Sequence, residues 1–145
     1  NDHRRVTFHD SCNVARGSNM GNIENGQFIL PREVIKAACN HFADMPKATI
    51  KASTFCCGGG GGLLTDDLIE LRIKGAMPRM QALKQSQEND GVNTLAAICA
   101  ICKSQFSKVL PNYDFDPYMI VSVHQLVSDA LVLSDKSETK AEDSL

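Results

Sequence analysis

The sequence has no tryptophan and few other aromatic residues, which make up 6% of its 145 residues. Acidic and basic side chains nearly balance, and the formal net charge at pH 7 is −2. Nucleic-acid-binding domains usually carry a basic patch, and single-strand binders stack bases on aromatic rings. This composition therefore argues against nucleic acid as a partner.

Long apolar runs are also missing. No stretch approaches the roughly 18 consecutive apolar residues that a membrane-spanning helix needs. Residues 1–5 include neither an initiator methionine nor an apolar signal region, and we interpret them as the start of an excised or processed fragment. We therefore expect any contact with a membrane to be made through another subunit.

Six cysteines are present, but the other features of a disulfide-rich secreted domain are not. Strand-like and helix-like patterns fill most of the chain, and the cysteine density is far below that of a cystine scaffold. We therefore expect a reducing compartment. The length fits one domain, which we predict over residues 1–133, followed by a disordered polar tail over residues 134–145.

The apolar periodicity predicts alternating strands and helices. Strands are expected over residues 5–9, 47–53, 92–98 and 119–123. Helices are expected over residues 31–42, 65–74, 103–110 and 124–133. Gly75 and Pro78 are expected to end the second helix, and residues 77–80 then form a kinked piece or a partner-binding lip. This order predicts an α/β fold, with a mostly parallel sheet flanked by helices.

Five of the six cysteines form an unusual pattern, which consists of Cys12, the adjacent pair Cys56-Cys57, and Cys99-Ala-Ile-Cys102. Five consecutive glycines follow the adjacent pair directly. Each cysteine group is expected to follow a strand, so all should converge at the carboxyl edge of the sheet, where α/β folds bind ligands. A soft metal held by thiolates needs such sulfurs from distant segments, together with backbone that can approach them closely.

Three kinds of site remain open on the residues alone. Structural zinc needs four ligands and usually draws on two Cys-x-x-Cys pairs, whereas one is present here. A metal-free thiol–disulfide oxidoreductase would use Cys99 and Cys102. An iron–sulfur centre would use the cysteine thiolates as ligands. The glycine run fits a linker or a phosphate loop poorly, because it precedes a capped helix and lacks a Gly-Lys-Ser/Thr ending.

Three polar residues lie beside the expected strand ends and are candidates for supporting a metal site. They are His9, Arg16 and His124. Each is also compatible with an ordinary surface or structural role. Cys39 lies on the apolar face of the expected 31–42 helix, and we interpret it as a core residue.

The cysteine pattern resembles the cysteine-rich CCG domain of heterodisulfide reductases and related proteins, over residues 9–127. The resemblance implies a noncubane [4Fe–4S] cluster with the ligands Cys12, Cys56, Cys57, Cys99 and Cys102. Amides of the glycine run, at Gly58, Gly59 and Gly60, would then point at the sulfurs. The gap before the adjacent pair is longer than is usual in that family, which places an insertion within residues 17–40. This leaves Cys39 as an alternative to Cys12 as the first ligand.

Four runs of sequence narrow the resemblance, at residues 8–16, 74–79, 97–103 and 122–126. They resemble the heterodisulfide-reductase-like subunit of the electron-transfer complex that serves dissimilatory sulfite reductase. The resemblance implies electron exchange with a disulfide or trisulfide of a small sulfur-carrier protein that has cysteines on a flexible C-terminal arm. It also implies an upstream ferredoxin-like part, a membrane cytochrome subunit as partner, and a cytoplasmic place on the inner face of the membrane.

Overall fold

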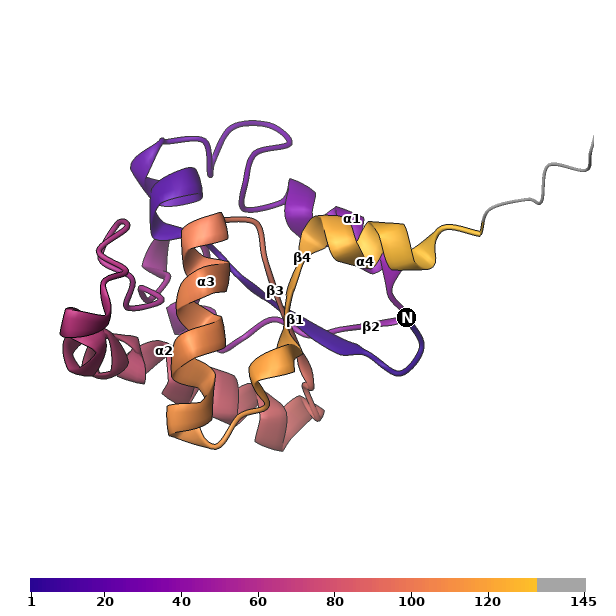
Figure 1. Cartoon of the computed structure of the whole chain (residues 1–145). Helices are drawn as coiled ribbons and strands as arrows, with labels where there is room; N and C mark the ends of the chain where they lie inside the picture. Colours follow the sequence, from indigo (N-terminus) through magenta and orange to yellow (C-terminus); the bar gives the residue numbers. More distant parts are fainter. Residues whose placement is uncertain (133–145) are drawn as a thin grey trace, which may run out of the picture.

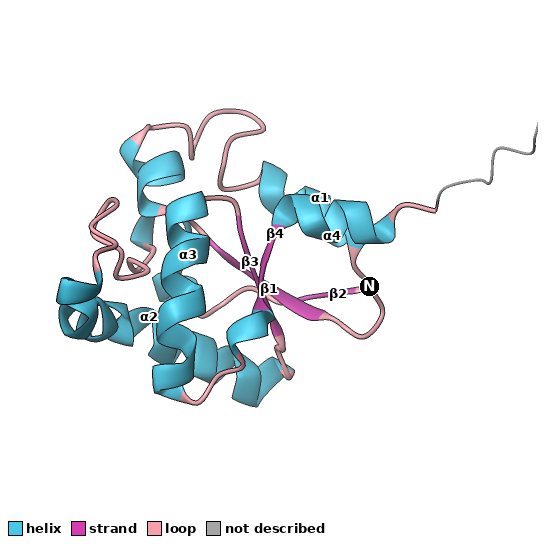
Figure 2. Cartoon of the chain, viewed as in Figure 1, coloured by secondary structure: helices cyan, strands magenta, loops and turns pink. Residues whose placement is uncertain are grey.

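The computed structural model of the protein describes residues 1–132, which form a four-stranded, all-parallel sheet with helices on both faces (Figures 1 and 2). The strands lie in the order β2-β1-β3-β4. Their bounds are β1 (Arg5–His9), β2 (His41–Phe42), β3 (Thr94–Ala97) and β4 (Ile120–Ser122). The predicted α/β class is confirmed, and the expected tail lies outside the described residues.

Two pairs of helices cover the sheet, one pair on each face (Figure 1). The pairs are α1 (Leu30–Ala38) with α4 (Val123–Ala130), and α2 (Ile69–Asp90) with α3 (Ala100–Val109). Within residues 1–132, no helix combines the length and the apolar character that crossing a bilayer requires.

The alternation of side chains along β1 decides which residues reach each face. Phe8 packs into the core beneath α1 and α4. The next residue, His9, points to the opposite face, where its ring meets Phe106 of α3 edge-on with 4.8 Å between the ring centroids. The last residue of β1 is thereby directed toward the α2–α3 face.

The strand expected over residues 47–53 is wrong. Two single turns of 3₁₀ helix, Lys47–Thr49 and Lys51–Ser53, take its place, and the two-residue β2 occupies the edge of the sheet. Lys51 has a φ of +54°, which is incompatible with an extended strand. The adjacent cysteine pair therefore does not follow a strand, contrary to the expectation that every cysteine group would.

The predicted break in the second helix is also wrong, because α2 continues through Gly75 and Pro78 to Asp90. Proline at position 78 removes one backbone hydrogen bond. The helix nevertheless buries Met80 and Leu83 in the core. Tertiary packing of an apolar face contributes more to helix stability than local propensity, so the helix tolerates the proline.

Residues 51–54 do not pair with a strand. Instead, Asp10, which directly follows β1, holds them against the sheet through hydrogen bonds. Its carboxylate accepts hydrogen bonds from both Nη atoms of Arg32, at 2.7 and 2.8 Å, and from the amide of Lys51 at 2.7 Å. The Thr54 hydroxyl donates to the Asp10 carbonyl at 2.9 Å. The exposed fractions of Asp10 and Arg32 are only 1% and 4%. This buried network of Asp10, Arg32, Lys51 and Thr54, which we call the Asp10 clamp, fixes the chain just before Cys56 beside the carboxyl end of β1.

Replacing Asp10 by alanine should destabilise the fold by about 3–5 kcal/mol, because it leaves the buried Arg32 guanidinium without this partner. The matched control is Glu33→Ala, which removes an exposed ion pair with Lys36 and should cost at most about 1 kcal/mol. Urea denaturation of both variants measures the difference. Similar small losses in the two variants would show that Asp10 does not clamp residues 51–54.

Candidate metal centre

Five of the six thiols meet at the carboxyl edge of the sheet, on the α2–α3 side. Neighbouring thiols interact pairwise in one unbroken chain, which runs Cys12–Cys56–Cys57–Cys102–Cys99. A ring nitrogen of His9 and the Sγ atoms of Cys57 and Cys102 lie within 4.8 Å of one another. Cys57 and Cys102 are buried, whereas the other three are half-buried. The site therefore has a buried inner side and a more accessible outer side.

The first cysteine opens one turn of π-helix, Cys12–Gly17, which directly follows the Asp10 clamp. Ser11 caps this turn by accepting a hydrogen bond from the Val14 amide at 3.2 Å, and its hydroxyl also interacts with the Cys99 thiol. Arg16 donates from Nη1 to the carbonyls of Ala52 and Thr54, both at 3.1 Å. Arg16 therefore braces the turn that carries Cys12 against the segment that leads to Cys56.

The glycine run wraps back over the adjacent cysteine pair and directs its amides at the sulfurs. The Gly58 amide donates to Cys56 Sγ at 3.3 Å, and the Gly60 amide also interacts with Cys56. The Gly59 amide interacts with Cys57. Such converging N–H groups form a backbone nest that favours negative charge on the sulfurs.

Gly58 is the position where this loop requires glycine most strictly. Its φ is +88°, and a Cβ atom there would lie 2.5 Å from the Arg72 carbonyl oxygen of α2. Gly75 faces it across the contact, where an added Cβ would lie 3.5 Å from the Gly58 Cα. Helix α2 can therefore pass against the loop and press the cysteine pair into the core.

The crowding of the thiols changes their acidity. Interaction with Cys102, together with burial, raises the pKa of Cys57 to about 12, against an opposing effect of Cys56. Interaction with Cys57, followed by burial, raises the pKa of Cys56. Burial also disfavours the thiolate of Cys99, but the amides of Cys102 and Ile101 and the Ser11 hydroxyl outweigh it and lower its pKa. A metal ion would supply the positive charge that several thiolates at this spacing require.

His9 lies against the inner thiols with an exposed fraction of 1%. Neither ring nitrogen has a hydrogen-bond partner within the described part of the chain. Burial, with a further effect of Arg79, holds the pKa of His9 well below its ordinary value, so the ring is neutral at pH 7. A neutral imidazole in this position can donate one N–H to a metal-bound sulfur.

Arg79 of α2 was not among the residues predicted from the sequence, yet its guanidinium lies beside this site, where it donates to Thr54 Oγ1 at 2.9 Å. The side chain is fully buried, and burial lowers the pKa of Arg79 to about 10, against the opposing effects of Asp10 and of cysteines 57, 102 and 56. The sequence did contain one sign of this role. Arg79 is a charged residue on the same helix face as the apolar Met80 and Leu83.

Two other candidates lie on the far face of the sheet. Cys39 caps the C-terminus of α1 and packs with Val6, Phe8 and Ile35 in the core under α1 and α4. The sheet thus separates it from the five thiols. His124 is an exposed residue of α4 and lines an apolar pocket between α1 and α4.

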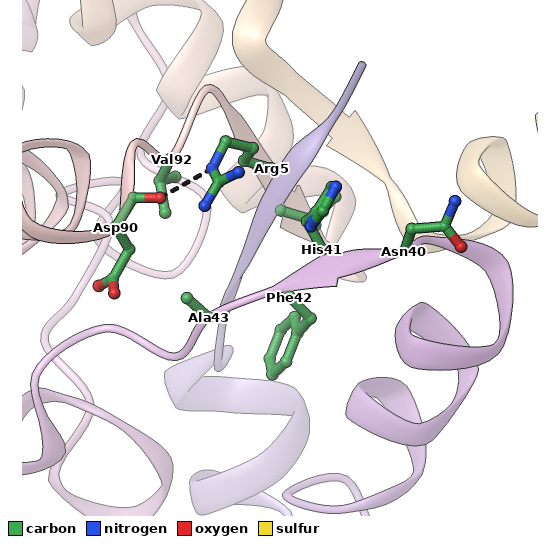
Figure 3. Close-up of a pocket in the computed structure, with 8 residues that line it drawn as sticks. Arg5, Asn40, His41, Phe42, Ala43, Asp90 and Val92 are labelled. Carbon is green, nitrogen blue, oxygen red and sulfur yellow. Dashed lines mark hydrogen bonds between the residues drawn. The ribbon is translucent and has the colours of Figure 1, made fainter. Parts of the chain in front are cut away.

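Of two further hollows, one lies away from the thiols and the other reaches one of them. One lies at the amino-terminal edge of the sheet, where Arg5 donates from Nε to the Asp90 carbonyl at 2.9 Å beside His41, and no cysteine lines it (Figure 3). The other is an apolar groove of about 250 Å³ that reaches Cys56. Its walls are formed by the glycine loop and by the leucines Leu63, Leu68 and Leu71.

Comparison with known proteins agrees with this geometry. The sequence pattern of the cysteine-rich domain family, CCG, matches residues 6–107. The chain belongs to the CCG family. This match confirms the resemblance to the cysteine-rich CCG domain that the cysteine spacing indicated.

Two curated relatives match almost the whole chain. The Hdr-like menaquinol oxidoreductase iron-sulfur subunit of Archaeoglobus profundus is 46% identical over 143 residues. The corresponding subunit 2 of Archaeoglobus fulgidus is 45% identical over 143 residues. Each alignment covers 99% of this chain but 24% of the relative, so the chain spans about a quarter of the length of these two relatives. No solved structure matches the chain.

Gly58→Ala should destabilise the protein by about 2–5 kcal/mol, from about 1–2 for the left-handed backbone and 1–3 for the clash with α2. Gly61→Ala is the matched control, because Gly61 has a φ of +71° but nothing within 4 Å of the added Cβ. It should cost only about 1–2 kcal/mol. Chemical denaturation measures both values, and equal losses would contradict the close contact at Gly58.

Proposed function

We propose that this chain is the electron-transfer domain of a heterodisulfide-reductase-like oxidoreductase, and that it holds a noncubane [4Fe–4S] cluster. The ligands would be Cys12, Cys56, Cys57, Cys99 and Cys102. The main support for the proposal is the unbroken chain of five interacting thiols. The two relatives are named as iron-sulfur subunits, which supports the choice of iron over other metals.

The donor set fits such a cluster in number and in charge. Five thiolates exceed the four ligands of a tetrahedral zinc site. Hydrogen bonds to the sulfurs are a main means by which proteins stabilise iron–sulfur centres. The glycine loop supplies amides to Cys56 and Cys57, the start of α3 supplies amides to Cys99, and the neutral His9 ring lies beside Cys57.

The position of each thiol suggests its part in the function. Cys57 and Cys102 would hold the inner side of the cluster away from water, since both are buried. Cys12, Cys56 and Cys99 are half-buried and would form the side that a substrate can approach. The bound cluster would supply one-electron transfer to or from a substrate sulfur. The apolar groove that reaches Cys56 would be the route by which that sulfur arrives.

The proposed substrate is a disulfide or trisulfide on the C-terminal arm of a small sulfur-carrier protein. Such an arm would lie in the apolar groove, which is lined by leucines and reaches Cys56. The proposed partners are an upstream ferredoxin-like part and a membrane cytochrome subunit, with the chain on the cytoplasmic face of the membrane. The naming of the relatives as menaquinol oxidoreductase subunits supports a membrane partner that handles quinol.

Anaerobically purified protein should contain iron and acid-labile sulfide in about a four-to-four ratio. Cys56→Ser should lose both, because it removes the thiol that connects Cys12 to Cys57. Cys39→Ser is the control and should keep both, since Cys39 lies across the sheet. Equal loss in the two variants would overturn the ligand assignment. One equivalent of zinc without visible absorption would instead indicate a structural zinc domain.

The groove can be tested with Leu71→Asp, which places a charge on its wall at an exposed position of α2. The variant should need at least about tenfold more oxidised carrier peptide to change the EPR spectrum of the cluster, a loss of about 1.4 kcal/mol in binding. Met77→Asp is the control, because Met77 is exposed on the same helix but does not line the groove. If both variants respond like the unaltered protein, the carrier arm does not use this groove.

A thiol–disulfide oxidoreductase is the second candidate, favoured by one observation. Cys99 is half-buried at the N-terminus of α3 and the following Cys102 is buried, as in thioredoxin-like dithiols. This candidate predicts that metal-free protein reduces a model disulfide and that alkylation of Cys99 stops it. It leaves the contacts of Cys12, Cys56 and Cys57 without a role, and inactive metal-free protein would exclude it.

A further inference from the structure

The buried guanidinium of Arg79 donates to Thr54, which precedes Phe55 and Cys56 in the chain, and within residues 1–132 no carboxylate is bound to it. Its Nη atoms donate to Met45 Sδ at 2.8 Å, to Thr54 Oγ1 at 2.9 Å and to the Thr49 carbonyl. All three acceptors are neutral, and Nε has no partner within residues 1–132. By contrast, the buried Arg32 forms ion pairs with two carboxylates, those of Asp10 and Asp44.

A buried cation is costly unless a negative charge compensates it. The carboxylate of Asp10 acts on Arg79 electrostatically, but Arg32 already binds that carboxylate through both Nη atoms. The other groups that act on Arg79 electrostatically are Cys57, Cys102 and Cys56. These three cysteines are among the proposed ligands, so a thiolate-bound metal centre would supply the negative charge that the buried guanidinium lacks.

We propose that Arg79 is the resident counter-cation of the metal centre, and that it raises the reduction potential of the cluster. This inference rests on the proposed function. A thiolate-bound iron–sulfur cluster carries net negative charge, and each electron that it accepts adds one more. A fixed positive charge in a buried site stabilises the reduced state more than the oxidised state, because little solvent screens the attraction.

The surroundings hold the guanidinium in a single place. Donation to Met45, Thr49 and Thr54 fixes the plane of the group, and the Phe55 ring lies 5.8 Å from its central carbon. Thr54 also bonds to the Asp10 carbonyl, so the Asp10 clamp and Arg79 share one hydroxyl. His9 provides no second cation here, because burial and the Arg79 charge keep its ring neutral at pH 7 through a lowered pKa.

The test is a redox titration, followed by EPR, of cluster-loaded protein and three variants. Arg79→Gln removes the charge and should shift the one-electron reduction equilibrium at least about tenfold toward the oxidised form, a fall of about 59 mV. Arg79→Lys keeps the charge and should stay close to the unaltered protein. Lys84→Gln removes an exposed charge from the same helix and should leave the potential unchanged.

An unchanged potential in Arg79→Gln would overturn the inference. If Arg79→Gln cannot retain its cluster, iron content becomes the measurement. Retention in Arg79→Lys with loss in Arg79→Gln supports the role of charge, whereas equal loss in both shows that only shape matters and refutes it. Failure of the unaltered protein to bind iron would refute the proposed function itself, so the two failures are distinguishable.

Discussion

The five sulfur atoms come together because two segments without strand structure are held against the carboxyl edge of the sheet. The buried pair of Asp10 and Arg32 holds the first of them, since Asp10 binds the Lys51 amide and its carbonyl receives the Thr54 hydroxyl. The contact of Gly58 with α2 holds the second. Without both, the adjacent cysteine pair would not reach the cysteines that follow β1 and β3.

The distribution of charge follows from the same packing. Crowding and burial oppose ionisation of the thiols, and three features of the fold favour it. These are the amides of the glycine loop, the amides at the start of α3, and the buried guanidinium of Arg79. The sheet also separates two roles of cysteine, because Cys39 packs as a core residue on the opposite face.

The sequence alone predicted the α/β class, the positions of three of the four strands, and the meeting of the cysteines at one edge of the sheet. The exceptions have physical causes that lie outside any local pattern. Alternating apolar residues around Ile50 indicated a strand, but the Asp10 side chain captures the Lys51 amide instead. Gly75 and Pro78 indicated a helix end, but burial of Met80 and Leu83 outweighs local propensity. The role of Arg79 was not predicted, because the residues around it come from distant segments that only the fold brings together.

X-ray absorption at the iron edge of the anaerobically purified protein tests the central claim most directly. The account predicts an iron environment of sulfur atoms alone, from thiolate and sulfide, with a second shell of neighbouring iron atoms at short distance. Iron surrounded by nitrogen or oxygen ligands, or iron without iron neighbours, would contradict it.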